Sequence, residues 1–172
     1  MRTAGVLLAL AGALVLQTTL AGLSMAGATR VNLVLVAVVY AALAFGPVTG
    51  LLAGTAGGLA QDALAGSIIG IGGFSQTLVG FSVGVLGAQF IVSQPVPRFV
   101  MFAGATFLHE ACFQALFALV ETRGFRMLLA ATLIQALVNA TVGVTAFWVV
   151  ERGPGLLQRR STRGATLSRR HF

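Results

Sequence analysis

The sequence has no lysine, one cysteine and two histidines among its 172 residues. Without lysine it cannot carry the GxxxxGK[ST] loop that cradles nucleotide phosphates, and Cys112 alone cannot form an internal disulfide. The run HEACF at 109–113 lacks the second histidine of the HExxH zinc motif, and the GxSxG elbow of serine hydrolases is missing. These absences argue against an enzyme, a bound metal and a cofactor.

Charge is scarce as well, and this defines the class of protein. Soluble domains carry roughly 25% charged residues, whereas here the charged share is 9%, the hydrophobic share is 57% and the mean hydropathy is +0.94. Six of the eleven arginines lie from Arg152 onward, so the net charge of +7 does not describe the spread basic surface of a nucleic-acid-binding domain. The sequence predicts an integral membrane protein that contacts lipid and no nucleic acid.

The apolar sequence divides into six predicted transmembrane helices. A span needs about 20 apolar residues, and three fit between Arg30 and Arg98, because proline or clustered glycine interrupts this segment at 45–50 and 65–73. The second span is short, so we expect it to be tilted, to begin earlier or to be shielded by its neighbours. The fold class is therefore a compact all-α membrane bundle. The first, second, fifth and sixth spans are expected near 4–25, 31–45, 99–120 and 127–150.

Arginine placement predicts the orientation of these spans. Cytoplasmic loops of membrane proteins carry an excess of arginine and lysine. With the N-terminus in the cytoplasm, Arg2, Arg98 and the six C-terminal arginines lie inside. Only Arg30, Arg123 and Arg126 then lie outside. Both termini are therefore expected to be cytoplasmic.

The two ends of the chain carry further expectations. Residues 1–151 are predicted to form the membrane domain and residues 152–172 a disordered basic tail, which either lies on anionic headgroups or only fixes the topology. The first span also has the pattern of a cleavable signal peptide, because Arg2 precedes an apolar core and AGA follows at 26–28.

Small residues form two stripes in the middle of the chain. Residues four apart lie nearly above one another on a helix, so each stripe occupies one helix face. Such stripes let membrane helices approach closely. We expect the third and fourth spans to pack together, more so within one chain than between chains. The first stripe consists of Gly50, Gly54, Gly58, Asp62 and Gly66, and the second of Thr77, Gly80, Gly84 and Gly87.

Polar side chains also fall within the last two predicted spans, where His109, Glu110, Gln135 and Asn139 lie. A charged acidic or basic side chain at mid-span costs about 2.5–3.5 kcal/mol on insertion scales. Glu110 should therefore have a partner, and the candidates are Gln114, Gln135, Asn139 and His109. We expect a satisfied internal polar network rather than a proton relay.

The run FGPVTGLLAGTAGGLAQDALAGSIIGIGGFSQTLVGFSVG, residues 45–84, resembles the central region of the MreD family of rod shape-determining membrane proteins. That family joins a glycine-rich span, an aspartate, a short glycine loop and a Thr-Leu-Val-Gly-aromatic segment. Arg30 and Asn32 stand at the family's Arg-Pro-Asp/Asn position, where Val31 replaces the proline and leaves the helix start less sharply fixed. Asn139 stands where many members have asparagine. The central matching positions are Gly54, Asp62, Gly66, Gly70, Thr77, Val79, Gly80 and Phe81.

The resemblance implies a non-enzymatic scaffold of the elongation machinery in the bacterial inner membrane, which supports lateral peptidoglycan synthesis and rod shape. Its implied partner is the bitopic protein MreC, and through MreC a SEDS-type glycosyltransferase, a class B penicillin-binding transpeptidase and the actin-like MreB. The family also resembles the substrate-binding subunits of energy-coupling-factor vitamin transporters in architecture. A small-molecule-binding transporter subunit is therefore the alternative function, and a small polytopic enzyme or proton channel is a third.

Asp62 lies one helical turn before Gly66 and the glycine loop. Its carboxylate can accept hydrogen bonds from the loop backbone or from the hydroxyls of Ser67, Ser75 and Thr77. We interpret Asp62 as a polar clasp that shapes the hairpin between the third and fourth spans. Direct contact with a ligand or a partner is the alternative.

Overall fold

The computed structural model describes residues 2–23, 31–66, 68–90, 92, 94–121 and 129–167. These residues are helical apart from short turns and contain no strand, so the all-α prediction is confirmed. The helices are α1 (Arg2–Leu23), α2 (Leu33–Phe45), α3 (Pro47–Ala65), α4 (Ile71–Gln89), α5 (Pro95–Val120) and α6 (Leu129–Leu167).

Four of the six helices are long and apolar enough to cross a membrane, judged by length and composition. They are α1, α4, α5 and the part of α6 up to Glu151. The helix α2 has 13 residues, which corresponds to about 20 Å. The helix α3 has 19 residues, but its glycines together with Gln61 and Asp62 dilute its hydropathy. The described residues thus form six helices where six spans were expected, and four of these helices are both long enough and apolar enough to cross a membrane.

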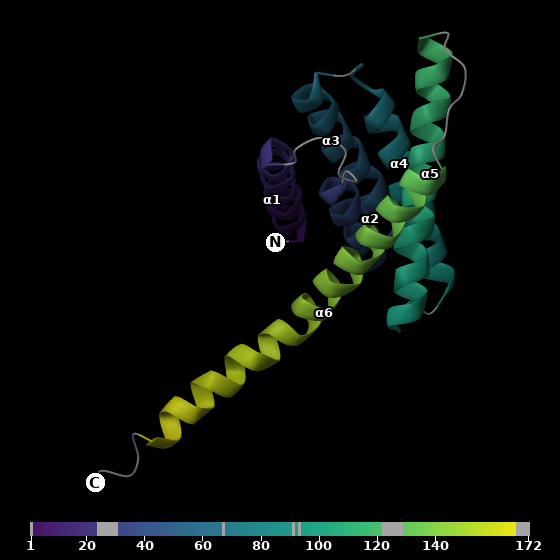
Figure 1. The fold of residues 1–172 in the computed structure, drawn as a ribbon. Coiled ribbons are helices and arrows are strands. Elements are labelled where there is room, and N and C mark those ends of the chain that lie inside the picture. The colour runs from purple at the N-terminus through teal and green to yellow at the C-terminus, as the bar shows by residue number, and fades with distance from the viewer. Residues whose placement is uncertain are drawn as a thin grey trace.

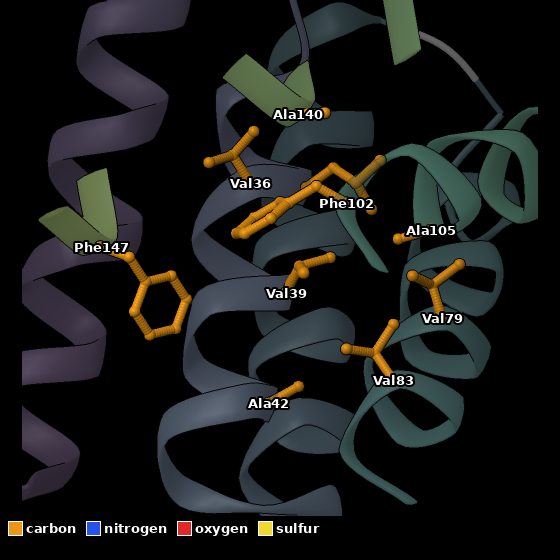
Figure 2. Close-up of a cluster of buried hydrophobic side chains, with 10 residues drawn as sticks. Val36, Val39, Ala42, Val79, Val83, Phe102, Ala105, Ala140 and Phe147 are labelled. Atoms are coloured by element: carbon orange, nitrogen blue, oxygen red, sulfur yellow. The ribbon is translucent and has the colours of Figure 1, made fainter. Parts of the chain in front are cut away.

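The short helix α2 lies in the middle of the bundle and contacts all five other helices (Figure 1). Seven of its 13 residues are buried. Between α2, α4, α5 and α6, Phe102 points into a cluster of valines and alanines and meets Phe147 edge-on at 6.2 Å (Figure 2). A second cluster joins α2 to α1 and α3 through Leu10, Val34 and Ala53. Shielding by neighbouring helices therefore accounts for a span this short.

Both ends of α2 are defined by local chemistry. The predicted break at 45–50 occurs at Gly46, whose φ of +94° favours glycine, and Pro47 opens α3. At the other end the Asn32 side chain accepts a hydrogen bond from the Leu35 N–H at 2.9 Å. Gln17 Oε1 of α1 accepts from the Val34 N–H at 3.2 Å. These two hydrogen bonds define the start of α2, although Val31 stands where the family that the sequence resembles has a proline.

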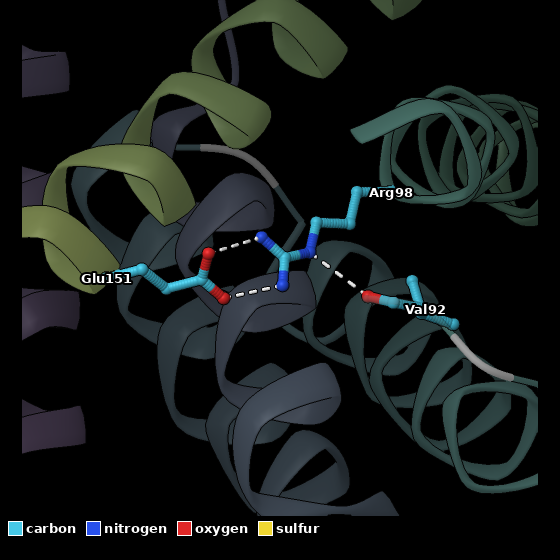
Figure 3. A network of polar contacts seen from close by, with 3 residues as sticks. All are labelled: Val92, Arg98 and Glu151. Carbon is cyan, nitrogen blue, oxygen red and sulfur yellow. Dashed lines mark hydrogen bonds and ion pairs between the residues drawn. The ribbon is translucent and has the colours of Figure 1, made fainter. Parts of the chain in front are cut away.

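An ion pair joins the start of α5 to α6 (Figure 3). The Arg98 guanidinium donates to both carboxylate oxygens of Glu151, at 2.5 and 2.9 Å, and to the Val92 carbonyl at 3.0 Å. It also lies 4.4 Å from the ring centroid of Phe147. Because a bidentate arginine constrains geometry as well as charge, this contact fixes the place where α6 leaves the bundle.

Beyond Glu151, α6 continues away from the bundle as a helix to Leu167 (Figure 1). This helical backbone differs from the disorder expected for the tail. The tail extends a helix that is already formed and therefore needs no new nucleation, although Gly153, Pro154 and Gly155 are residues of low helix propensity. The boundary at residue 151 and the contact with lipid stay predictions, and residues 168–172 lie outside the described part of the chain.

Candidate functional site: a glycine hairpin beside a buried polar network

The helices α3 and α4 pack together within one chain, and they do so through their backbones. A methyl group added to Gly54 would overlap the Gln76 carbonyl, and one added to Gly80 would overlap the Gly50 carbonyl. A methyl group on Gly58 would lie 2.6 Å from the Gly73 Cα. Such backbone contact leaves no room for any side chain larger than hydrogen.

Further glycines extend this contact at its two ends. At one end Gly84 lies directly against Pro47. At the other end Gly66 and Gly70 have φ values of +62° and +109°, so they close α3 and open α4 in the left-handed region. Gly58 faces α4. Its neighbour Gly57 faces α2, because a methyl group on Gly57 would lie 2.9 Å from the Val34 side chain. The stripes predicted from residues four positions apart did not include Gly57, Gly72 or Gly73. Each of these three glycines nevertheless belongs to a pair of consecutive glycines in the sequence.

Asp62 is buried, with 4% of its surface exposed, and it caps α4 from the preceding helix. Its Oδ2 accepts hydrogen bonds from the N–H groups of Gly70 at 2.9 Å and of Gly73 at 3.1 Å. Its Oδ1 lies where a side chain on Gly72 would lie. The N-terminal N–H groups of a helix lack partners within that helix and favour negative charge. The carboxylate therefore supplies both hydrogen bonds and charge at the start of α4.

The described donors to Asp62 are the backbone N–H groups of Gly70 and Gly73, one of the two kinds of donor that the sequence suggested, whereas the hydroxyls of Ser75 and Thr77 contact other groups. The Ser75 hydroxyl is used by His109 on α5. The Thr77 hydroxyl contacts Thr55 at 2.8 Å and donates to the Gly73 carbonyl at 2.6 Å. Ser67 lies outside the described residues. A hydroxyl inside a helix can donate to the carbonyl four residues earlier. That carbonyl is nearer than the Asp62 carboxylate and competes with it for the hydroxyl proton.

A chain of buried polar side chains connects four helices next to this hairpin. Ser75 of α4 contacts His109 Nδ1 of α5 at 2.6 Å, and His109 Nε2 contacts Asn32 Nδ2 at 3.4 Å. The Asn32 N–H at the start of α2 donates to Asn139 Oδ1 of α6 at 3.1 Å. Asn139 Nδ2 then donates to Thr106 of α5 at 3.2 Å. All five residues are at most 6% exposed.

One assignment of protons satisfies this network. The Ser75 hydroxyl has a single proton, which it donates to the His109 carbonyl at 3.0 Å. His109 Nδ1–H then donates to Ser75, and Nε2 accepts from Asn32. Likewise Thr106 donates to the Phe102 carbonyl at 2.9 Å while it accepts from Asn139. A neutral histidine fits every contact, and the Ser75 proton does not point at a histidine that could activate the hydroxyl.

Glu110 of α5 is only partly buried and takes no part in this network. Of its four candidate partners, His109 and Asn139 lie in the network described above. Its pairing with Gln114 or Gln135 stays a prediction. In the described part of the chain no three histidine, cysteine or acidic side chains come together in a group able to hold a metal ion.

Removal of the Asn139 side chain should destabilise the bundle. Asn139→Ala leaves the Asn32 N–H without its acceptor and the Thr106 hydroxyl without its donor, and a buried group left unpaired costs about 1–3 kcal/mol. We expect a clear fall in the melting temperature of the protein in detergent. Thr141→Ala is the matched control, because the exposed Thr141 hydroxyl donates only to the Leu137 carbonyl of its own helix. Equal melting temperatures for the two variants would contradict the network.

Comparison with known proteins agrees with the extent of the bundle. Residues 2–151 match the family model described as rod shape-determining protein MreD. No curated protein and no solved structure matches the chain. The match covers α1 to α5 and the part of α6 that ends at the Arg98–Glu151 ion pair, and it stops where the basic tail begins.

Proposed function

We propose, from the premise that this chain belongs to the MreD family of rod shape-determining proteins, that it is a non-enzymatic membrane scaffold of the cell-elongation complex. A role in rod shape determination follows from the family. The proposal adds that the protein binds MreC and thereby supports lateral peptidoglycan synthesis. The family match over residues 2–151 is the observation that carries it.

The way the interior is filled supports a scaffold. The helices α3 and α4 are in backbone contact, and the centre around α2 is occupied by Phe102, Val39 and their neighbours. The five residues of the buried polar network, which are Ser75, His109, Asn32, Asn139 and Thr106, are paired with one another. The bundle is therefore built to hold its shape, and its outer surface is available to partners. Through MreC we place it with a SEDS-type glycosyltransferase, a class B penicillin-binding transpeptidase and MreB.

We also propose a multi-pass position in the bacterial inner membrane with both termini in the cytoplasm. The start of α5, which carries Arg98, and the C-terminal part of α6 lie at the lower end of the view in Figure 1. The end of α3 and the end of α5 lie at the upper end. The arginine-rich segments thus share one side of the bundle, as the excess of arginine in cytoplasmic segments requires.

Depletion of the protein tests this function. Rod-shaped cells should become round, and MreC should co-purify with the tagged protein from native membranes. Normal cell width after verified depletion, with no MreC recovered, would refute the assignment. Recovery of ATPase subunits and a bound small molecule in place of MreC would instead support a vitamin-type transporter subunit.

A further inference from the structure

The side chain of Gln76 on α4 is an exception to the pairing of buried polar groups. It is 1% exposed, and its Nε2 donates to Gln61 Oε1 of α3 at 2.7 Å. Its Oε1 is buried, and no donor in the described part of the chain lies within hydrogen-bonding distance of it. An exchange of the amide oxygen and nitrogen would place an NH2 group there instead. Either orientation therefore leaves one buried polar group unpaired.

The unpaired oxygen lies beneath α1, next to Gly57 of α3. A Cβ added to Gly57 would lie 3.7 Å from Gln76 Oε1 and 3.1 Å from Leu10 Cδ2 of α1. The same Cβ would lie 2.9 Å from Val34 Cγ1 of α2. Leu10 and Val34 close the space beside the oxygen, but their apolar side chains offer no donor. Because a buried acceptor without a partner has lost its hydration for nothing in return, the oxygen weakens the arrangement in which Leu10 covers it.

The helix α1 is held weakly over this oxygen. It stands at one edge of the bundle, where it contacts α2 and α3 (Figure 1). Of residues 3–20 only Leu10 is buried, and Gln17 accepts a hydrogen bond from the Val34 N–H. In a membrane the hydrophobic effect does not hold helices together, because lipid tails are as apolar as leucine. Leu10 can therefore move from the bundle into lipid at little cost, and this movement uncovers the Gln76 oxygen.

The group that fits the uncovered oxygen is an uncharged hydroxyl. It donates to Gln76 Oε1, and its own oxygen can accept from the amide of Gln61, which is partly exposed. It carries no charge, because Leu10 and Val34 beside it belong to an apolar cluster, where an unpaired charge is costly. We propose that Gln76 and Gln61 form a binding site for a hydroxyl group and that α1 is its displaceable cover. This inference goes beyond the proposed function, since it requires no MreC.

The position of the site favours a hydroxyl that comes from the bilayer. Gln76 is five residues after Ile71, the first residue of α4, which is about 7.5 Å along the helix. This depth is within reach of the membrane interface, where the free hydroxyl of a diacylglycerol lies. Water offers the same O–H donor, so the experiment has to separate these two sources.

Distance measurements by electron spin resonance test the displacement of α1. Spin labels are attached through Gly12→Cys on α1 and Gly104→Cys on α5 in a Cys112→Ser background, because a Cβ at either glycine has nothing within 4 Å. In nanodiscs of phosphatidylcholine, which has no hydroxyl, we expect one main distance. Addition of diacylglycerol should produce a second, longer distance. Triacylglycerol, which lacks the hydroxyl, should not, and labels at Gly104→Cys and at Val48→Cys of α3, a 69% exposed position, should keep their distance in every lipid.

Gln76→Met tests the role of the oxygen, because methionine keeps the length of the side chain and removes both polar atoms. The variant should lose the longer distance that diacylglycerol produces. Its melting temperature in detergent should equal or exceed that of the wild type, since an unpaired buried group has been removed. Asn139→Ala, which breaks paired contacts, should melt below the wild type in the same assay.

Two results would support the site and identify its ligand. A longer distance that requires diacylglycerol assigns a lipid hydroxyl, and one that is present in phosphatidylcholine alone and absent from Gln76→Met assigns water.

Four results would overturn the inference. They are a single distance in all lipids, an equal response to triacylglycerol, a longer distance that persists in Gln76→Met, and a melting temperature of Gln76→Met below that of the wild type. Capture of MreC by the wild type is measured separately, so the proposed function stands or falls independently of these results.

Discussion

Gly54→Val should abolish the accumulation of folded protein, whereas Gly12→Val should leave it unchanged. A Cβ at Gly54 would overlap the Gln76 carbonyl oxygen and lie 2.6 Å from its carbon. These are backbone atoms, so no side-chain rotation relieves the overlap, and α3 must move away from α4. The expected cost lies at or above the upper end of the roughly 1–3 kcal/mol of ordinary overpacking.

The Gly12→Val control separates the effect of the α3–α4 contact from the effect of valine on helix propensity. Gly12 and Gly54 both lie inside helices, so valine changes the intrinsic helical preference by a similar amount. A Cβ at Gly12 has nothing within 4 Å, and the same holds at Gly104 of α5, which gives a second control. Membrane abundance, monodispersity in detergent and rescue of rod shape in depleted cells are the measurements. A Gly54→Val variant as abundant and monodisperse as Gly12→Val would show that α3 and α4 do not touch.

The α3–α4 hairpin was the part of the fold most open to prediction from the sequence. Its signals are local: glycine at every fourth position, Gly46 beside a proline at one end, and Gly66 and Gly70 at the other. Each of these patterns acts within a few residues along the chain. The sequence therefore predicted which two helices pack together and which faces they use.

The buried polar network was beyond such reasoning, because its partners are far apart along the chain. Asn32 and His109 are separated by 77 positions and Asn32 and Asn139 by 107. The sequence marked His109 and Asn139 as polar residues in apolar spans, but it did not pair them. Thr106 carried no signal of its own, because a hydroxyl in a helix can always bond to its own backbone. The sequence suggested Ser75 as a donor to Asp62 and not as a partner of His109.

The central place of α2 was hidden for a different reason. In a soluble protein an apolar face reveals the core, but in a membrane the outer surface is apolar as well. The run from Val34 to Ala42 has the same composition as a lipid-facing helix. Only the short length of the predicted span, residues 31–45, indicated that neighbours shield it.

Asp62→Leu should lower both the amount of folded protein and its function, whereas Asp62→Asn should retain most of each. Leucine removes the acceptor of two backbone hydrogen bonds, from Gly70 and Gly73. Hydrogen bonds to a charged group contribute about 1.5–3 kcal/mol each, and the start of α4 also loses a favourable negative charge. Asparagine keeps one oxygen that can accept from both N–H groups, but it loses the charge and has an NH2 donor in place of the second carboxylate oxygen.

Ala63→Leu is the control for the asparagine and leucine variants, because it places a leucine at the next, exposed position of the same helix turn. Membrane abundance, detergent monodispersity and MreC capture distinguish the two roles of Asp62. If the carboxylate holds the hairpin, the three quantities fall together in Asp62→Leu, since capture depends on the amount of folded protein. If Asp62→Leu is normally abundant and monodisperse but captures no MreC, the carboxylate is a partner-binding group, and the clasp is wrong.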